Sequence, residues 1–180
     1  MGKYICLFAL VSLAACKDKK VPDISQNENA RDNILKVVME VKIPEDDTFQ
    51  LFYFEDASQA SYKVEKRISV PVTRSDNFQK VEFELPVKLI PYKFRIDVGE
   101  KGLQTPVEIK HIKLEYNTNY IEIENPVFDR FFQTNIYLEK SKNTLIRKEV
   151  DGRSDPFFVS TALLIKKMHI EFLISTKASY

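Results

Sequence analysis

The sequence predicts an all-β fold, an antiparallel β-sandwich of jelly-roll type with about eight or nine strands and a short C-terminal helix. Short segments in which apolar and polar residues alternate recur at intervals of roughly ten residues, and turn residues separate them. Only 4 glycines occur in 180 residues. A single segment with helical periodicity follows the last strand signal, at about 161–173.

The first half of the pattern predicts three strands. In 37–43, apolar residues on one face alternate with charged residues on the other, as expected for a half-buried strand. In 49–54 both faces are apolar, which predicts a central strand covered on both sides. In 68–72, Pro71 predicts an edge strand or a bulge, because proline donates no ladder hydrogen bond.

The two clearest strands follow, at 81–85 and 92–98, and each has one wet face. Alternation directs Phe83, Phe94 and Ile96 into the core. The next strand, 107–116, changes phase at Lys110-His111, and this slip predicts a β-bulge.

The rest of the chain is predicted to contain a turn at 117–119, a strand at 121–125 and a single helical turn within 127–132. A final hairpin is expected around 141–143. Ser160 is predicted to cap the C-terminal helix, because serine is a favoured N-cap residue.

Residues 13–16, Leu-Ala-Ala-Cys, follow Lys3 and a short apolar run, and they resemble the lipobox of bacterial lipoproteins. The resemblance implies cleavage before Cys16, a diacylglycerol on its sulfur and an acyl group on its new α-amino group. We therefore expect a signal peptide at 1–15, a flexible tether at 16–33 and one sandwich domain with its helix at 34–180. The alternative is an ordinary secretory signal with a chance cysteine.

Charge and cysteine content exclude several classes of function. The chain has 27 basic and 26 acidic residues, and Lys3 is the one charged residue in 1–15, so the mature chain is balanced at 26 of each. A balanced chain has no general reason to bind nucleic acid. Cys16 would be the only mature cysteine, which excludes disulfides and thiol catalysis, and the core alone must hold the fold.

No catalytic constellation is recognisable, and we expect the protein not to be an enzyme. His111 and His169 are the only histidines, and no Gly-x-Ser-x-Gly motif is present. Two pairs of glutamates, Glu82/Glu84 and Glu122/Glu124, have the spacing of residues on one strand face. Both pairs belong to the polar side of an alternating pattern, so we interpret them as solvated.

One weak metal signal occurs at Asp151 and Asp155, which flank a glycine turn of the oxygen-rich kind that suits calcium. An ordinary turn is the favoured alternative. We expect no cofactor other than the lipid on Cys16.

The strand pattern of about 34–150 loosely resembles galactose-binding-like domains and carbohydrate-binding modules. The resemblance implies a sugar stacked on an aromatic ring and fixed by polar side chains. Candidate exposed aromatics are Phe52, Phe54, Tyr62, Tyr116 and Tyr120, with Asp56, Gln59, Asn117 and Asn119 as polar companions.

The predicted site is the turn that carries Tyr116, Asn117, Asn119 and Tyr120. The alternative for Tyr116 is that it continues the inward row of Ile112 and Leu114.

These observations predict an envelope lipoprotein that is anchored in the outer membrane and carries a non-catalytic binding or accessory sandwich. Both the periplasmic face and the cell-surface face of that membrane remain as alternatives. Glycan is the leading ligand class. The alternative is a structural or assembly subunit that docks another envelope protein through a sheet face or edge strand.

Overall fold

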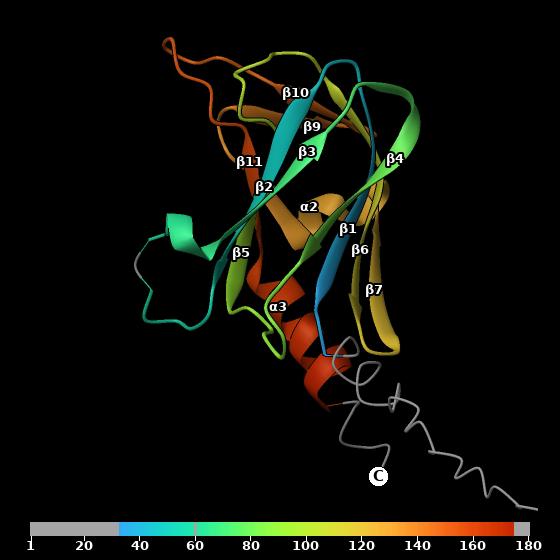
Figure 1. Ribbon diagram of the computed structural model, residues 1–180, viewed down its shortest axis with the longest axis vertical. Helices are drawn as coiled ribbons and strands as arrows, with labels where there is room; N and C mark the ends of the chain where they lie inside the picture. The colour runs from blue at the N-terminus through green and yellow to red at the C-terminus, as the bar shows by residue number, and fades with distance from the viewer. Residues whose placement is uncertain (1–32, 60, 175–180) are drawn as a thin grey trace, which may run out of the picture.

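The protein is an antiparallel β-sandwich, in which two sheets face each other and a helix closes one end (Figure 1). The computed structural model describes residues 33–59 and 61–174. The predicted signal peptide, Cys16 and the tether up to residue 32 lie outside these residues. The all-β sandwich with a short C-terminal helix is confirmed, but the described residues form eleven strands instead of the eight or nine expected.

Sheet A has the strand order β4-β1-β6-β10-β9, and β7 also pairs with β6. Strand β6 is long enough to serve two neighbours on one side, because its first residues pair with β10 and its last six with β7. The strands of this sheet are β1 (Lys36–Ile43), β4 (Ser75–Glu84), β6 (Val107–Tyr116), β7 (Asn119–Glu124), β9 (Leu138–Ser141) and β10 (Thr144–Arg147).

Sheet B has the order β3-β2-β5-β11-β8. Strand β3 lies at its edge, as Pro71 predicted, and β2 lies between two neighbours. Its strands are β2 (Asp47–Phe54), β3 (Arg67–Val72), β5 (Lys93–Asp97), β8 (Phe132–Thr134) and β11 (Phe157–Ser160). The sequence analysis did not predict β8, which has only three residues, or β11, whose four residues directly precede the predicted helix.

The β-bulge in β6 is confirmed. Glu40 pairs with His111 and Val41 with Ile109, so Lys110 has no partner in β1. The Asn125 amide donates hydrogen bonds to the carbonyl oxygens of Ile109 and Lys110, at 2.7 and 2.9 Å. These bonds satisfy backbone groups where the ladder is disrupted.

The C-terminal helix consists of α3 (Ala162–Met168) and a π-helical turn, η3 (His169–Ile174). Its N-cap is Thr161, whose hydroxyl accepts a hydrogen bond from the Leu164 N–H. The prediction of Ser160 as the cap was wrong by one residue. The Ser160 hydroxyl instead accepts a hydrogen bond from the Phe94 N–H, at 3.0 Å in the core.

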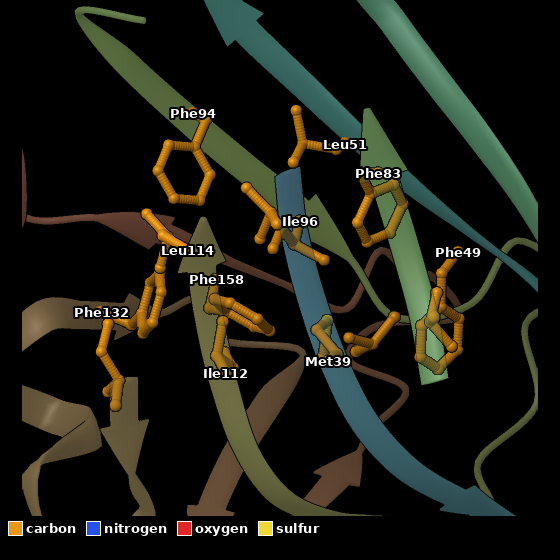
Figure 2. Close-up of a cluster of buried hydrophobic side chains, with 14 of the residues drawn as sticks. Met39, Phe49, Leu51, Phe83, Phe94, Ile96, Ile112, Leu114, Phe132 and Phe158 are labelled. Atoms are coloured by element: carbon orange, nitrogen blue, oxygen red, sulfur yellow. The ribbon is translucent and has the colours of Figure 1, made fainter. Parts of the chain in front are cut away.

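The core lies between the sheets, where side chains of both layers point toward one another (Figure 2). Phe83, Phe94 and Ile96 are buried, as alternation predicted. The predicted helical turn is α2 (Phe128–Phe131), and its Phe128 ring packs 5.2 Å from those of Phe132 and Phe158. These ring contacts pack α2 against β8 and β11.

A buried ion pair joins segments that are distant in sequence. Arg147 Nη1 lies 2.6 Å from Asp47 Oδ2, and both side chains are fully buried. Arg147 also donates to the carbonyl and hydroxyl oxygens of Thr105, while Asp47 Oδ1 accepts from three backbone N–H groups. A buried charge pair is tolerated only when its remaining hydrogen-bonding groups are satisfied in this way.

Gly99 makes room for this pair. Its φ is +136°, and an added Cβ would lie 2.4 Å from Arg147 Nη1 and 2.7 Å from Asp47 Oδ2. No other residue fits at this position without displacing the ion pair.

Candidate functional site

The predicted turn site is only partly available to a ligand. Tyr116 is 7% exposed and packs 5.8 Å from the Phe172 ring, so its prediction as a stacking residue was wrong. It continues the inward row of β6, and η3 covers it. Tyr120 is 60% exposed, and Lys113 Nζ lies 4.7 Å from the centre of its ring. The Asn119 amide donates to the Glu171 carbonyl oxygen, which ties the hairpin to η3.

Asn117, the remaining residue of that site, is exposed and has a φ of +55°. Its role is therefore to form the turn, because asparagine tolerates the left-handed conformation. The predicted turn contributes one exposed ring, that of Tyr120.

The two aspartates of the predicted calcium site do not gather further ligands. Asp151 occupies a turn with a φ of +52°, and Asp155 Oδ1 lies 3.0 Å from Arg95 Nη2. Within residues 33–59 and 61–174, no group of three or more metal-ligating side chains is arranged to hold an ion. Asp155 thus forms an ion pair with Arg95 and does not join Asp151 in a metal site.

The outer face of sheet A is a network of surface ion pairs. Lys36 lies 2.6 and 2.7 Å from Glu82 and Glu84, whose carboxylates are solvated as predicted. The two ring nitrogens of His111 each lie 3.6 Å from a carboxylate oxygen, one of Glu40 and one of Glu122. Charges on this face are mutually compensated, and such exposed pairs contribute little to stability.

The outer face of sheet B carries a different group of side chains, which we call the Arg95 cluster: Phe52, Tyr62, Arg95, Asp97 and Phe157. The Arg95 Cζ atom lies 3.8 Å from the centre of the Phe157 ring, 5.3 Å from that of Phe52 and 5.6 Å from that of Tyr62. Cation–π contacts of this kind fix a guanidinium among aromatic faces.

Strand register builds the Arg95 cluster. Phe52 of β2 is directly opposite Arg95 of β5, and Asp97 of β5 is directly opposite Phe157 of β11. Residues two apart on a strand share a face, so Arg95 and Asp97 both point outward. Tyr62 reaches the cluster from the loop between β2 and β3.

Hydrogen bonds fix the guanidinium further. Arg95 Nε and Nη2 donate to the two Asp97 oxygens at 2.5 and 2.6 Å, and Nη2 also donates to Asp155 Oδ1. Bidentate pairs of this kind are both strong and directional. Within the described residues, the third nitrogen, Nη1, donates no hydrogen bond.

A second polar group of the Arg95 cluster has no partner. The Tyr62 hydroxyl is buried and makes no hydrogen bond within the described residues. Burial raises the pKa of Tyr62 to about 12, an effect that the nearby Arg95 charge opposes. Burial also raises the pKa of Asp97, against the opposing hydrogen bond from Arg95. The cluster thus combines aromatic faces with two polar groups that have hydrogen-bonding capacity left.

The sequence identified part of this site. Phe52 and Tyr62 were candidate aromatics and do lie on this face. Phe54 is 8% exposed, because the Tyr62 ring covers it at 4.3 Å, and its prediction as an exposed ring was wrong. Asp56, a predicted polar companion, accepts hydrogen bonds from the Ser58 backbone and hydroxyl in its own loop.

Three members of the Arg95 cluster were missed: Arg95, Asp97 and Phe157. The available signal was the wet face of the strand at 92–98, which we interpreted as ordinary solvated surface.

Comparisons with known proteins add no relative to this description. No family model, no curated protein and no solved structure matches the chain. Of the helices in the described part of the chain, none has the length and apolar character needed to span a bilayer. The class of molecule that the structure supports is a two-sheet β-sandwich, and the Arg95 cluster lies on the outer face of its sheet B.

Proposed function

We propose that the protein is a lipid-anchored envelope protein with a non-catalytic sandwich that binds glycan through the Arg95 cluster. The observation that carries this proposal is the Arg95 guanidinium, which aromatic rings and Asp97 hold in place while its Nη1 donates no hydrogen bond within the described residues. The Tyr62 hydroxyl beside it is buried without a partner, so a ligand reaches it only when the side chains that cover it move. A sugar presents both a face of C–H groups, which packs on aromatic rings, and hydroxyls that need fixed donors and acceptors.

The rigid setting of these groups supports the same function. Asp97 and three rings hold Arg95 in place before any ligand arrives, so little side-chain entropy is lost on binding. The remaining Nη1 donors suit a sugar hydroxyl or carboxylate.

The anchor is tested by metabolic labelling. Cells that express the wild-type chain or Cys16→Ala are grown with a fatty-acid analogue, and the label on the protein is measured. The lipobox resemblance predicts that the variant carries none. Equal labelling of both proteins would contradict lipidation at Cys16.

The glycan site is tested on a broad glycan array that includes carboxylated sugars. Tyr62→Phe keeps the ring and removes the hydroxyl, and we expect it to weaken binding by up to about tenfold, the worth of one hydrogen bond. Tyr120→Phe is the matched control, because it removes a hydroxyl from the exposed ring on sheet A. We expect it to bind as the wild type does.

Two outcomes would overturn the glycan assignment. One is a wild-type protein that binds nothing on the array while it captures a defined envelope protein, which would favour an assembly subunit. The other is glycan binding that Tyr120→Phe weakens and Tyr62→Phe does not, which would move the site to the β6–β7 turn.

A further inference from the structure

A groove of about 800 Å³ lies between the C-terminal helix and the outer face of sheet B. Its volume falls within the range of small-ligand sites in proteins. The wall formed by the helix comes from α3 and η3, and the floor comes from β5, β8 and β11. The lining residues that the argument uses are Lys93, Val159, Ile165, Lys166, His169 and Ile170.

The groove wall is apolar because of the helix geometry. Leu164, Met168 and Phe172 turn one helix face into the core, where all three are fully buried. The π-helical turn then places Ile170 and Ile174 toward the groove, and they are 46% and 61% exposed. Large apolar side chains left in solvent beside a concave surface are typical of a ligand or partner site.

The charges of the groove are of one sign. Lys93 and Lys166 line it, His169 lies beside them, and no carboxylate is among the described lining residues. Neither lysine forms an ion pair with a described residue, whereas Lys167, which does not line the groove, pairs with Glu171 at 3.1 Å. An apolar trough with basic groups is complementary to a molecule that has a hydrocarbon chain and a negative head.

Helix α3, which forms one wall of the groove, lies at the end of the sandwich where the described chain begins (Figure 1). The Asn33 carbonyl oxygen accepts a hydrogen bond from the Lys88 N–H, and the loop that contains Lys88 leads to Tyr92, another lining residue. Asn33, the first described residue, is thus joined to the loop that leads into the groove.

From these observations we infer that the groove is a binding site for an anionic single-chain amphiphile. The chain lies along Ile165, Ile170 and Val159, and the carboxylate or phosphate head lies against Lys93 and Lys166. A soluble fatty acid and a lipid of the bilayer share this chemistry. The groove adjoins the Arg95 cluster on this face, because Val159 pairs with Arg95 in the sheet, but no residue of that cluster lines it, so the inference does not depend on glycan binding.

The test uses residues 16–180 with Cys16→Ala, so that no attached acyl chain competes. Displacement of a fluorescent dansyl-undecanoate probe reports binding, and dodecanoate, dodecanol and dodecyltrimethylammonium are the competitors. We expect dodecanoate to compete at least about tenfold better than the cationic analogue, because the basic groups favour one sign of charge.

Matched variants on one helix locate the site. Ile170→Glu should weaken dodecanoate binding by about tenfold or more, since it places a negative charge in the apolar wall. Leu163→Glu, at a position of almost equal exposure (45%) outside the groove, should leave binding unchanged. Ala162→Phe, which fills the groove at an exposed position, supplies a second variant if Ile170→Glu does not fold.

The head-group contacts have their own control. Lys166→Ala should weaken dodecanoate binding and leave dodecanol binding unchanged, and Lys167→Ala should affect neither. Tyr62→Phe should also bind dodecanoate normally, which separates this site from the proposed glycan site.

Cosedimentation with phosphatidylglycerol vesicles distinguishes the two sources of ligand. Loss of cosedimentation in Ile170→Glu assigns the bilayer, whereas dodecanoate binding without cosedimentation assigns a soluble acid. The inference is overturned if the wild type does not bind the probe, if Ile170→Glu and Ala162→Phe bind dodecanoate as the wild type does, or if the cationic analogue competes equally well.

Discussion

At the scale of single residues, the most consequential interaction is the buried pair of Asp47 and Arg147. Both side chains are inaccessible to solvent, and together they bind the β1–β2 turn, the loop after β5 and the end of β10. An ion pair in such a place is costly to break, because the partner that remains is a buried charge without compensation.

Replacing either partner should therefore destabilise the fold strongly. We expect Asp47→Asn and Arg147→Met each to lower the free energy of unfolding by about 3–5 kcal/mol. Urea denaturation of the single variants and of the double variant measures the effect. The double variant should lose less stability than the two single variants lose together, because no unpaired buried charge remains.

The control for this prediction is a surface pair. Glu139→Gln breaks the contact with Lys148, whose side chain is 42% exposed, and should change stability by no more than about 1 kcal/mol. An Asp47→Asn variant as stable as Glu139→Gln would show that the buried pair does not hold the loops.

Tyr62 gives a prediction about pH. Its pKa in the folded protein is about 12, above the ordinary value of 10.0, because its hydroxyl is buried. The folded state therefore holds the phenol proton more tightly than the unfolded chain does. This difference makes stability fall as the pH rises from about 10 to about 12, and it has no effect below that range.

Tyr62→Phe should remove this part of the loss of stability at alkaline pH. The other tyrosines contribute equally in the wild type and in the variant. Urea midpoints measured across the alkaline range test the difference, and absorbance titration of tyrosinate gives the pKa itself. The same alkaline slope for both proteins would contradict a raised pKa of Tyr62 in the folded state.

At the scale of secondary structure elements, the junction between β11 and α3 shows how adjacent hydroxyls take different roles. Thr161 caps the helix, and Ser160 accepts the Phe94 N–H in the core. Both residue types are good N-caps, so composition alone does not separate them. The difference arises because Ser160 is the last residue of β11 and faces β5.

Ser160→Ala should therefore act on the sheet, and Thr161→Ala on the helix. We expect the first to cost about 1–3 kcal/mol, since a buried N–H loses its acceptor, and the second about 1 kcal/mol. Hydrogen exchange distinguishes them: the Phe94 amide should exchange faster in Ser160→Ala alone. Thr161→Ser keeps the cap and serves as the control, and faster Phe94 exchange in Thr161→Ala would contradict these roles.

At the scale of the whole molecule, two sheets and one helix share a single core. Phe94 belongs to this core, is 1% exposed and packs 6.1 Å from the Phe132 ring; both residues are labelled in Figure 2. Its side chain therefore contributes to the packing between β5 and β8 on the inner face of sheet B.

Phe94→Ala should lower the free energy of unfolding by about 3–5 kcal/mol, because it removes buried surface and leaves a cavity. Phe78→Ala, at a 40% exposed position of edge strand β4, should change it by no more than about 1 kcal/mol. The two urea midpoints are compared directly. An unchanged midpoint for Phe94→Ala would show that strand β5 faces the other way in solution.

The sequence by itself determined which residues face inward and where strands are interrupted. Phe83, Phe94 and Ile96 follow from alternation, Lys110 in its bulge follows from a change of phase, and the edge position of β3 follows from Pro71. Each is a local property, because the period of two and the missing N–H of proline act over a few residues.

The tertiary structure alone decided which strands are neighbours and what their registers bring together. Alternation places Arg95 on an outer face but does not reveal that Phe52 and Phe157 flank it there. The same holds for Asp47 and Arg147, which are 100 residues apart. Partner choice depends on the free energy of the whole packed arrangement, and no short stretch of sequence carries that information.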